Sequence, residues 1–261
     1  MAETKRTVGW PRTLTWLALT LSVGGLAAAL VAAIGSGQGA WHFRVGFTIL
    51  RYAFYAAIAG GLLAIIAWLG GRRRGAGLGR YNLLAFLIAL AFVGYLGSHI
   101  ATARSVPAIH DVTTNLQDIP QFTLLKVRED NLEKIPDNDD PRLKAMDPES
   151  RWKALHRAGY PDLWPIRVSW TVEETIRRAE AVARKRGWEI AKVDPEAGIL
   201  EATDTTFFFR FKDDVVLRAR PFAEAKGGTQ VDMRSISRVG GSDVGVNAKR
   251  IRSFLSDLQK S

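Results

Sequence analysis

The chain has 261 residues, contains no Cys and carries a formal net charge of +10. This length allows one or two domains, and the absence of Cys excludes a disulfide scaffold, a Cys nucleophile and Cys-ligated zinc. Residues 1–104 hold ten of the 36 Lys and Arg residues but one of the 26 Asp and Glu residues. Because the basic excess lies in the apolar part of the chain, the sequence argues against a nucleic-acid protein, whose basic face should lie on its folded domain.

Three long uncharged stretches within residues 1–104 predict membrane-spanning helices. The first has its apolar core at about residues 14–34, and the others cover residues 52–71 and 81–103. Each is about 20 residues or longer, the length that a helix needs to cross the hydrocarbon layer. No Asp, Glu, Lys or Arg lies in the middle of a span, so we expect an anchor in a lipid bilayer rather than a transport path. Cleavage of the first span as a signal peptide is the alternative, although its apolar stretch is longer than those of signal peptides.

The Lys and Arg residues near the span ends predict the orientation. The two sides of the membrane receive unequal numbers: Lys5, Arg6, Arg12, Arg72, Arg73, Arg74 and Arg80 on one side, and Arg44, Arg51 and Arg104 on the other. The side richer in Lys and Arg is normally cytoplasmic. We therefore expect a bacterial inner-membrane protein with a cytoplasmic N-terminus and a periplasmic C-terminal domain.

The rest of the chain predicts a linker followed by an α+β domain. Prolines interrupt residues 105–164, which indicate an extended linker and loop region with a short helix at 152–156. In residues 165–261 we expect strands at 165–170, 188–193, 199–211, 215–220 and 229–237, and helices at 171–187 and 246–259. Short turns, including 213–214 and 226–228, imply antiparallel pairing. The order β-α-β-β-β-β-α predicts a curved antiparallel sheet with helices packed on one face.

The richest polar stretch surrounds the end of the last predicted strand. Its candidate ligand-binding residues are Asp232, Arg234, Ser235, Ser237, Arg238, Ser242, Asp243, Asn247 and Arg250. Strand alternation divides the first four between two faces, and Ser242, Asp243 or Asn247 is placed to cap the last helix. Arg238, Arg250 and the helix N-terminus together could hold an anion. The alternative is that the charged residues pair with one another and fix the turn between strand and helix.

A second candidate cluster, formed by His110, Asp111, Thr113 and Thr114, follows the third span. His, Asp and several Ser residues suggest a hydrolase, but nothing in the sequence brings a nucleophile, a base and an acid together. The sequence has no Gly-x-Ser-x-Gly turn, no phosphate-binding Gly-rich motif, and His residues without metal-ligand spacing. We therefore predict no catalytic residue, no metal and no cofactor.

Several stretches of the chain resemble one family. They are residues 109–114, 187–188, 199–203, 209–218 and 231–251. Together they resemble the domain of unknown function 1499 family over about residues 105–258. The most specific part is the run Arg-Ser-x-Ser-Arg-x-Gly-x-Ser-Asp-x-Gly-x-Asn, which ends at Asn247. The resemblance implies the extent of the outer domain and gives no reaction. Members with an N-terminal multi-span anchor resemble envelope proteins of Gram-negative bacteria.

Three functions fit these observations. The first is a non-enzymatic module outside the membrane that binds an envelope lipid, another anionic ligand or a protein partner. Its support is the anchor and an aromatic stretch, Phe207, Phe209 and Phe211, for which plain core packing is the alternative. The second is a scaffold subunit of an inner-membrane complex that packs through small residues such as Gly24, Gly25, Ala57 and Gly61. The third is an envelope hydrolase that uses Asp111 or Asp232 as base and Arg234 or Arg238 against developing charge.

Overall fold

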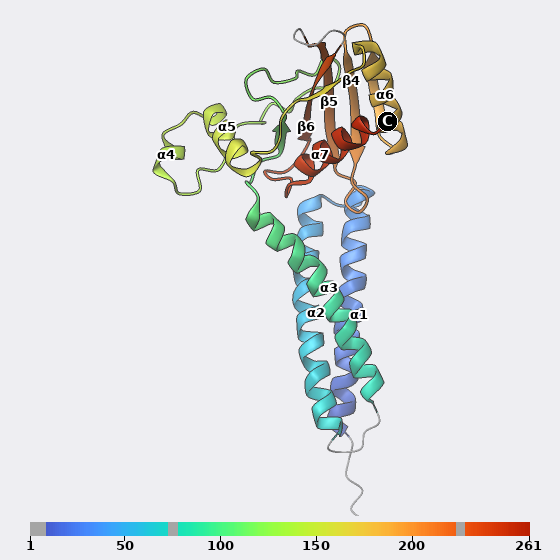
Figure 1. The fold of residues 1–261 in the computed structure, drawn as a ribbon. Helices are drawn as coiled ribbons and strands as arrows, with labels where there is room; N and C mark the ends of the chain where they lie inside the picture. The colour runs from blue at the N-terminus through green and yellow to red at the C-terminus, as the bar shows by residue number, and fades with distance from the viewer. Residues whose placement is uncertain (1–8, 73–77, 223–227) are drawn as a thin grey trace, which may run out of the picture. The chain divides into compact units, whose positions relative to one another are not determined.

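The computed structural model describes residues 9–72, 78–222 and 228–261, which form two compact units (Figure 1). The first unit holds the long apolar helices α1 (Gly9–Gly37), α2 (Phe43–Arg72) and most of α3 (Gly79–Ser105), together with Phe207–Arg210. The second holds the other described residues from Thr102 onward. Several residues used in the predictions lie outside the described ones: Lys5, Arg6, Arg73, Arg74, Lys226 and Gly227.

The three predicted spans are helices of 29, 30 and 27 residues, each long and apolar enough to cross a membrane. Small residues bring α1 and α2 close together. A Cβ atom added at Gly60 would lie 2.5 Å from the Oγ of Ser22, and one at Gly25 would lie 2.9 Å from the carbonyl oxygen of Ala53. Gly24, by contrast, has open space around its Cα. The close approach therefore depends on Gly25 of α1 and Gly60 of α2.

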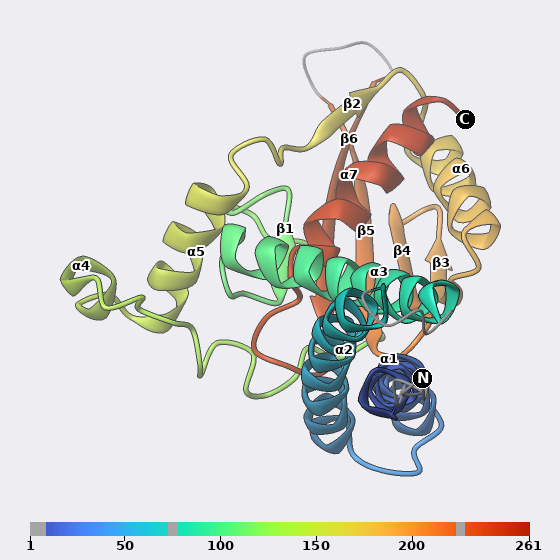
Figure 2. The same cartoon turned by 90° about the horizontal axis from the view of Figure 1, so that it is seen from below.

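The second unit is built on one antiparallel sheet. Its strands are β1 (Asp111–Thr113), β2 (Ile166–Val168), β3 (Glu189–Asp194), β4 (Ile199–Thr205), β5 (Lys212–Pro221) and β6 (Thr229–Ser237), in the order β1-β6-β5-β4-β3, with β2 also paired to β6. The helices are α4 (Pro141–Lys144), α5 (Pro148–Gly159), α6 (Val172–Lys185) and α7 (Val246–Gln259). Figure 2 shows α6 and α7 beside the strands. The predicted α+β fold with an antiparallel sheet is confirmed.

Strand alternation gives the sheet two different faces. Leu217 and Met233 pair with each other and share a buried core with α6 and α7. The neighbouring pair, Arg218 and Asp232, lies on the opposite face. Residues 115–125 run across this second face, which we call the polar face, and we call these residues the covering segment. Its backbone accepts hydrogen bonds from Arg218 at Asp118 and from Arg234 at Pro120.

The strand register also defines two ends of the sheet. Asp111 pairs with Ile236, Ile236 with Asp214, and Asp214 with Thr203. The start of β1, the end of β6 and the β4–β5 turn therefore share one end, which we call the hairpin end. The β3–β4 turn, the end of β5 and the start of α6 lie at the other end, which we call the pocket end.

The structure corrects two predictions at the hairpin end. Residues 206–211 are the turn between β4 and β5, not part of a strand, and Phe207 is 83% exposed rather than buried. The N–H of Thr206 donates to the carbonyl of Phe211, and the N–H of Phe211 donates to the Thr206 hydroxyl, each at 2.8 Å. Asp213 and Asp214 lie inside β5 rather than in a turn, because the buried Arg250 pairs with Asp213 and Arg238 pairs with Asp214.

The stretch between residues 105 and 164 contributes more structure than its composition indicates. It supplies β1, which pairs with β6, and the helices α4 and α5. The short helix expected at 152–156 extends over Pro148–Gly159, since the side chain of Asp147 caps its first turn. The other boundaries agree closely: β6 and α7 cover the expected residues, and Thr171 caps α6 through the N–H of Glu174.

Candidate functional site

The pairing of β1 with β6 brings the two candidate clusters together. The Nε and Nη2 of Arg234 donate to the two carboxylate oxygens of Asp111 at 2.9 and 2.7 Å. Both side chains are buried. The Nδ2 of Asn131 donates to the same carboxylate at 2.8 Å, so its Oδ1 accepts from the Nε2 of His110 at 3.0 Å. A buried chain of polar contacts thus runs from Arg234 to His110.

Two buried His residues, His110 and His156, lie at this site. Burial, with a smaller contribution from the Arg128 charge, lowers the pKa of His110 below its ordinary value. The Nε2 of His156 accepts from the N–H of Thr113 at 3.1 Å, and burial lowers the pKa of His156 to about 4. Both imidazoles are therefore neutral near pH 7. The hydroxyl of Thr114 accepts from the N–H of Met233, which ties the end of β1 to β6.

Asn247 is the centre of a second network, beneath the N-terminus of α7. Its Oδ1 accepts from the Ser235 hydroxyl at 2.7 Å and from Arg250, and its Nδ2 donates to the Ser237 hydroxyl at 3.0 Å. The Nη2 of Arg250 donates to Asp213 at 2.6 Å. The Nε of Arg250 also donates to Asp204 at 2.8 Å. Carboxylates therefore already surround this guanidinium.

The loop before α7 is organised by Asp243. Its carboxylate accepts from the backbone N–H groups of Gly245 and Asn247, each at 2.8 Å, and so satisfies the first turn of α7. Burial raises the pKa of Asp243 to about 6 despite these hydrogen bonds. Val244 is held at a φ of 54°, an unusual value for a β-branched residue. The Ser242 hydroxyl accepts from its N–H at 3.2 Å. Of the three predicted caps, Asp243 is the one that contacts the helix backbone from outside.

Arg238 lies on the polar face, away from Arg250. Its Nε and Nη2 both donate to the carboxylate of Asp214 at 2.8 Å, and this pairing raises the pKa of Arg238. Arg250 lies on the helix-covered face with Ser235. The structure therefore does not bring the two guanidinium groups to one anion-binding position, as the sequence had suggested.

Asp232 ties the covering segment to the sheet. Its Oδ2 accepts from Arg218 and from Arg220, each at 2.9 Å, and its Oδ1 accepts from Asn115 at 3.2 Å. The same two Arg side chains bind Asp118 of the covering segment, and their hydrogen bonds lower its pKa. Two carboxylates and two guanidinium groups thus form one charge-balanced cluster.

Glu201 is not among the site residues predicted from the sequence. This side chain is fully buried on the polar face, and its carboxylate accepts from the N–H groups of Thr123, Leu124 and Leu125 and from the Thr123 hydroxyl. Burial opposes ionisation, but these hydrogen bonds outweigh it and lower the pKa of Glu201. An acidic residue within an apolar strand, between Leu200 and Ala202, was the available signal.

A comparison with known families identifies the domain that contains the sheet. The sequence profile described as "Protein of unknown function (DUF1499)" matches residues 111–258, more than half of the chain. The chain belongs to the DUF1499 family. No curated protein matches the chain. The match begins at the first residue of β1 and ends in the last turn of α7, so the DUF1499 domain contains the whole sheet and every candidate site residue except His110.

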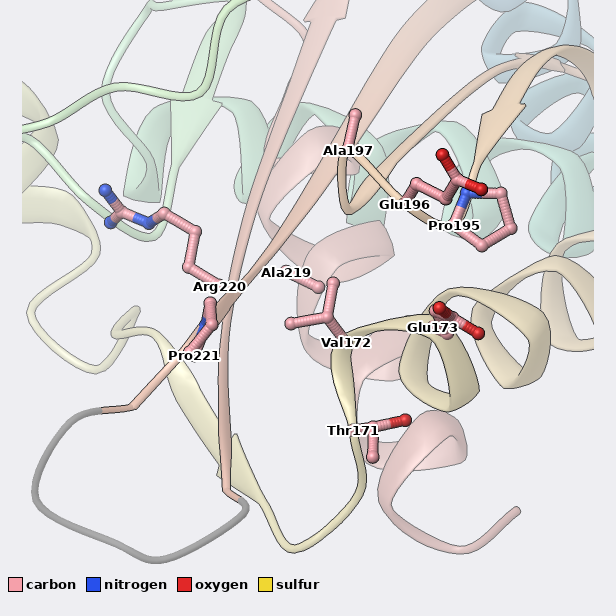
Figure 3. Close-up of a pocket in the computed structure, with 9 residues that line it drawn as sticks. All are labelled: Thr171, Val172, Glu173, Pro195, Glu196, Ala197, Ala219, Arg220 and Pro221. Atoms are coloured by element: carbon pink, nitrogen blue, oxygen red, sulfur yellow. The ribbon is translucent and has the colours of Figure 1, made fainter.

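A pocket of about 510 Å³ lies at the pocket end of the DUF1499 domain (Figure 3). Three segments line it: the start of α6, the β3–β4 turn and the end of β5. Figure 3 labels its residues: Thr171, Val172, Glu173, Pro195, Glu196, Ala197, Ala219, Arg220 and Pro221. Gly198, which has a φ of +68°, closes the turn where an added Cβ would lie 2.1 Å from the carbonyl oxygen of Ala219. The sequence did not indicate this pocket, because its lining residues come from three separate segments.

The hydrogen-bonding groups of the candidate residues are used within the protein. Each candidate side chain in the two clusters makes a hydrogen bond to another protein group, and most are buried. The described residues contain no group of three or more His, Cys, Asp or Glu side chains arranged to hold a metal ion. The clusters are therefore arranged to hold β1, β6, α7 and the covering segment together.

Proposed function

We propose that the chain is a periplasm-facing module of the bacterial inner membrane that binds a protein partner through its DUF1499 domain. Three helices able to span a membrane support the anchor. The observation that carries the binding role is the open pocket at the pocket end of the sheet. The occupied hydrogen-bonding groups of the two candidate clusters favour binding over catalysis. The Ser235 and Ser237 hydroxyls bond to Asn247, and the Asp111 and Asp232 carboxylates bond to Arg side chains.

The lining of the pocket indicates the kind of partner. Val172, Ala219 and Pro221 provide apolar surface. Glu196 and Glu173, which also pairs with Arg177 at 2.8 Å, place carboxylates on it. The guanidinium of Arg220, the cation among the lining residues, already binds Asp118 and Asp232. The pocket therefore favours a basic peptide segment of an envelope protein over an anionic lipid head group.

Site-specific photo-crosslinking in living cells tests this proposal. A photoreactive amino acid replaces the exposed Ala197, and a Glu173→Lys/Glu196→Lys double variant reverses the pocket charge. Glu180→Lys is the matched control, since Glu180 and Glu173 each pair with an Arg one turn later on α6. We expect a discrete adduct that the double variant abolishes and the control retains. An adduct that survives reversal of the pocket charge, or the absence of any adduct, would contradict the proposal.

A further inference from the structure

The turn between β4 and β5 carries two exposed aromatic side chains. Phe207 is 83% exposed and Phe208 is 44% exposed. Their rings contact each other edge to face, with centroids 5.1 Å apart. Arg210, in the same turn, is also exposed. Exposure of two neighbouring Phe rings to water has a free-energy cost roughly proportional to their exposed apolar area. Transfer of these rings into an apolar environment is therefore favourable.

The turn has a defined shape. The two hydrogen bonds between Thr206 and Phe211 close it at its base. Arg210 adopts a φ of 55°, which reverses the chain direction before β5. On either side, β4 and β5 remain paired up to Thr205 and Lys212. The exposed rings are thus presented by a closed hairpin.

The strand register places this turn at the end of the sheet where the chain arrives from α3. The row that contains Asp111 continues through Ile236 and Asp214 to Thr203, close to the turn. Only residues 106–110 separate the end of α3 from the start of β1. Because an extended chain covers at most about 3.5 Å per residue, the start of β1 lies within roughly 20 Å of the last residue of α3.

We propose that the tip formed by Phe207, Phe208 and Arg210 inserts into the interface of the bilayer that the three helices span. Aromatic rings are favoured at the boundary between head groups and acyl chains, and an Arg beside them can bind lipid phosphates. The tip is a second point of attachment for the DUF1499 domain. Insertion of the tip does not depend on whether the pocket binds a peptide.

Spin labelling tests the insertion directly, because the chain has no Cys. Phe207→Cys and Trp164→Cys are labelled separately in the full chain and reconstituted into vesicles of phosphatidylethanolamine and phosphatidylglycerol. Trp164 is the matched control, because it is a 66% exposed aromatic residue that precedes β2, whose partners on β6 lie toward the pocket end. Each label is then exposed to oxygen, which concentrates in the bilayer, and to a water-soluble nickel complex.

We expect the label at 207 to be more accessible to oxygen than to nickel, and the label at 164 to show the reverse. Replacing Phe208 with Ser in the Phe207→Cys variant should shift the label at 207 toward the nickel complex. Equal access of nickel to both labels would overturn the proposal by placing the tip in water. Shielding of the 207 label from both reagents would also overturn it, because the tip would then be packed against protein.

Discussion

Asp111 and Arg234 form a buried ion pair with two hydrogen bonds, of 2.9 and 2.7 Å, although they lie 123 positions apart in the chain. The pair lies on the polar face, where β1 meets β6. Arg234 also donates to the carbonyl of Pro120, and Asp111 accepts from Asn131. One ion pair therefore joins β1, the strand that follows the three apolar helices, to β6 and to the covering segment.

Removal of one member of this pair should destabilise the domain strongly. We expect Arg234→Met to lower the free energy of unfolding by about 3–5 kcal/mol, because it leaves the Asp111 carboxylate buried without its partner. The Asp111→Asn/Arg234→Met double variant should recover part of the loss. Denaturant unfolding of the full chain in detergent measures both. Arg142→Met is the control, since it breaks a 2.8 Å pair with Asp140 in which the Arg is 87% exposed, and it should change little. Equal effects of the two Arg variants would contradict the structural role.

Glu201 should hold the covering segment on the sheet. We expect Glu201→Gln to lower the free energy of unfolding by about 1.5–3 kcal/mol, because the carboxylate loses charge-assisted hydrogen bonds from Thr123–Leu125. Hydrogen exchange should rise first in residues 118–125. Glu189→Gln provides the control, as Glu189 lies mostly in solvent and pairs with Lys212. Unchanged exchange in the covering segment would show that other contacts hold it.

His156 should make the domain sensitive to acid. Its pKa is lowered from 6.5 to about 4, so the folded state binds the proton less readily than the unfolded chain. Its contribution of about 3 kcal/mol is fully present above pH ~6.5 and is lost as the pH falls through about 4. His156→Gln should remove this part of the pH dependence, as measured by denaturant unfolding across that range. If the free energy of unfolding of the Gln variant changed with pH as steeply as that of the wild type, another group would cause the acid sensitivity.

Asp243 should act in the opposite direction. Its pKa is raised from 3.8 to about 6, so the folded state holds the proton more tightly than the unfolded chain. Stability from this group is present below pH ~4 and falls by about 3 kcal/mol as the pH rises through about 6. Between pH ~4 and pH ~6, the opposite pH dependences of stability contributed by Asp243 and His156 partly cancel. We therefore expect Asp243→Asn to steepen the rise of stability with pH, whereas His156→Gln flattens it. Parallel pH profiles for the two variants would be inconsistent with these pKa shifts.

The packing of α1 against α2 should depend on Gly60. We expect Gly60→Leu to separate the helices, because an added Cβ already lies 2.5 Å from the Oγ of Ser22. Cys residues introduced at Ala18 and Ala64, which share one packed cluster, report the separation as a lower disulfide yield in membranes. Gly24→Leu is the control, because that glycine has open space around it. A similar disulfide yield in the Gly60→Leu and Gly24→Leu variants would show that the contact between α1 and α2 does not depend on Gly60.

Local patterns in the sequence predicted much of the fold. The three spans, β6 and α7 follow from uninterrupted apolar stretches, strand alternation and helical periodicity, and all five lie where these patterns place them. Asp213 and Asp214 show the limit of such patterns. Adjacent Asp residues favour turns, but Arg250 and Arg238, which are distant in sequence, stabilise them within β5.

The candidate site shows the same limit. The sequence identified Asp111 and Arg234 separately, yet their contact depends on the β1–β6 register, and β1 is three residues long. Phe207, Phe209 and Phe211 alternate as strand residues do, but the hydrogen bonds of Thr206 close a turn around the first two. Residue types indicated which side chains matter, whereas the tertiary pairing determines what each one contacts.

The proposed role of the DUF1499 domain in the envelope is tested most directly by determining on which side of the membrane the domain lies. Alkaline phosphatase, which is active only outside the cytoplasm, is fused after Ser261, and a second fusion is placed in the loop between the second and third spans. We predict an active enzyme after Ser261 and an inactive one in the loop, with fluorescence from green fluorescent protein in the reverse pattern. An inactive phosphatase and a fluorescent protein after Ser261 would place the domain in the cytoplasm and contradict its role in the envelope.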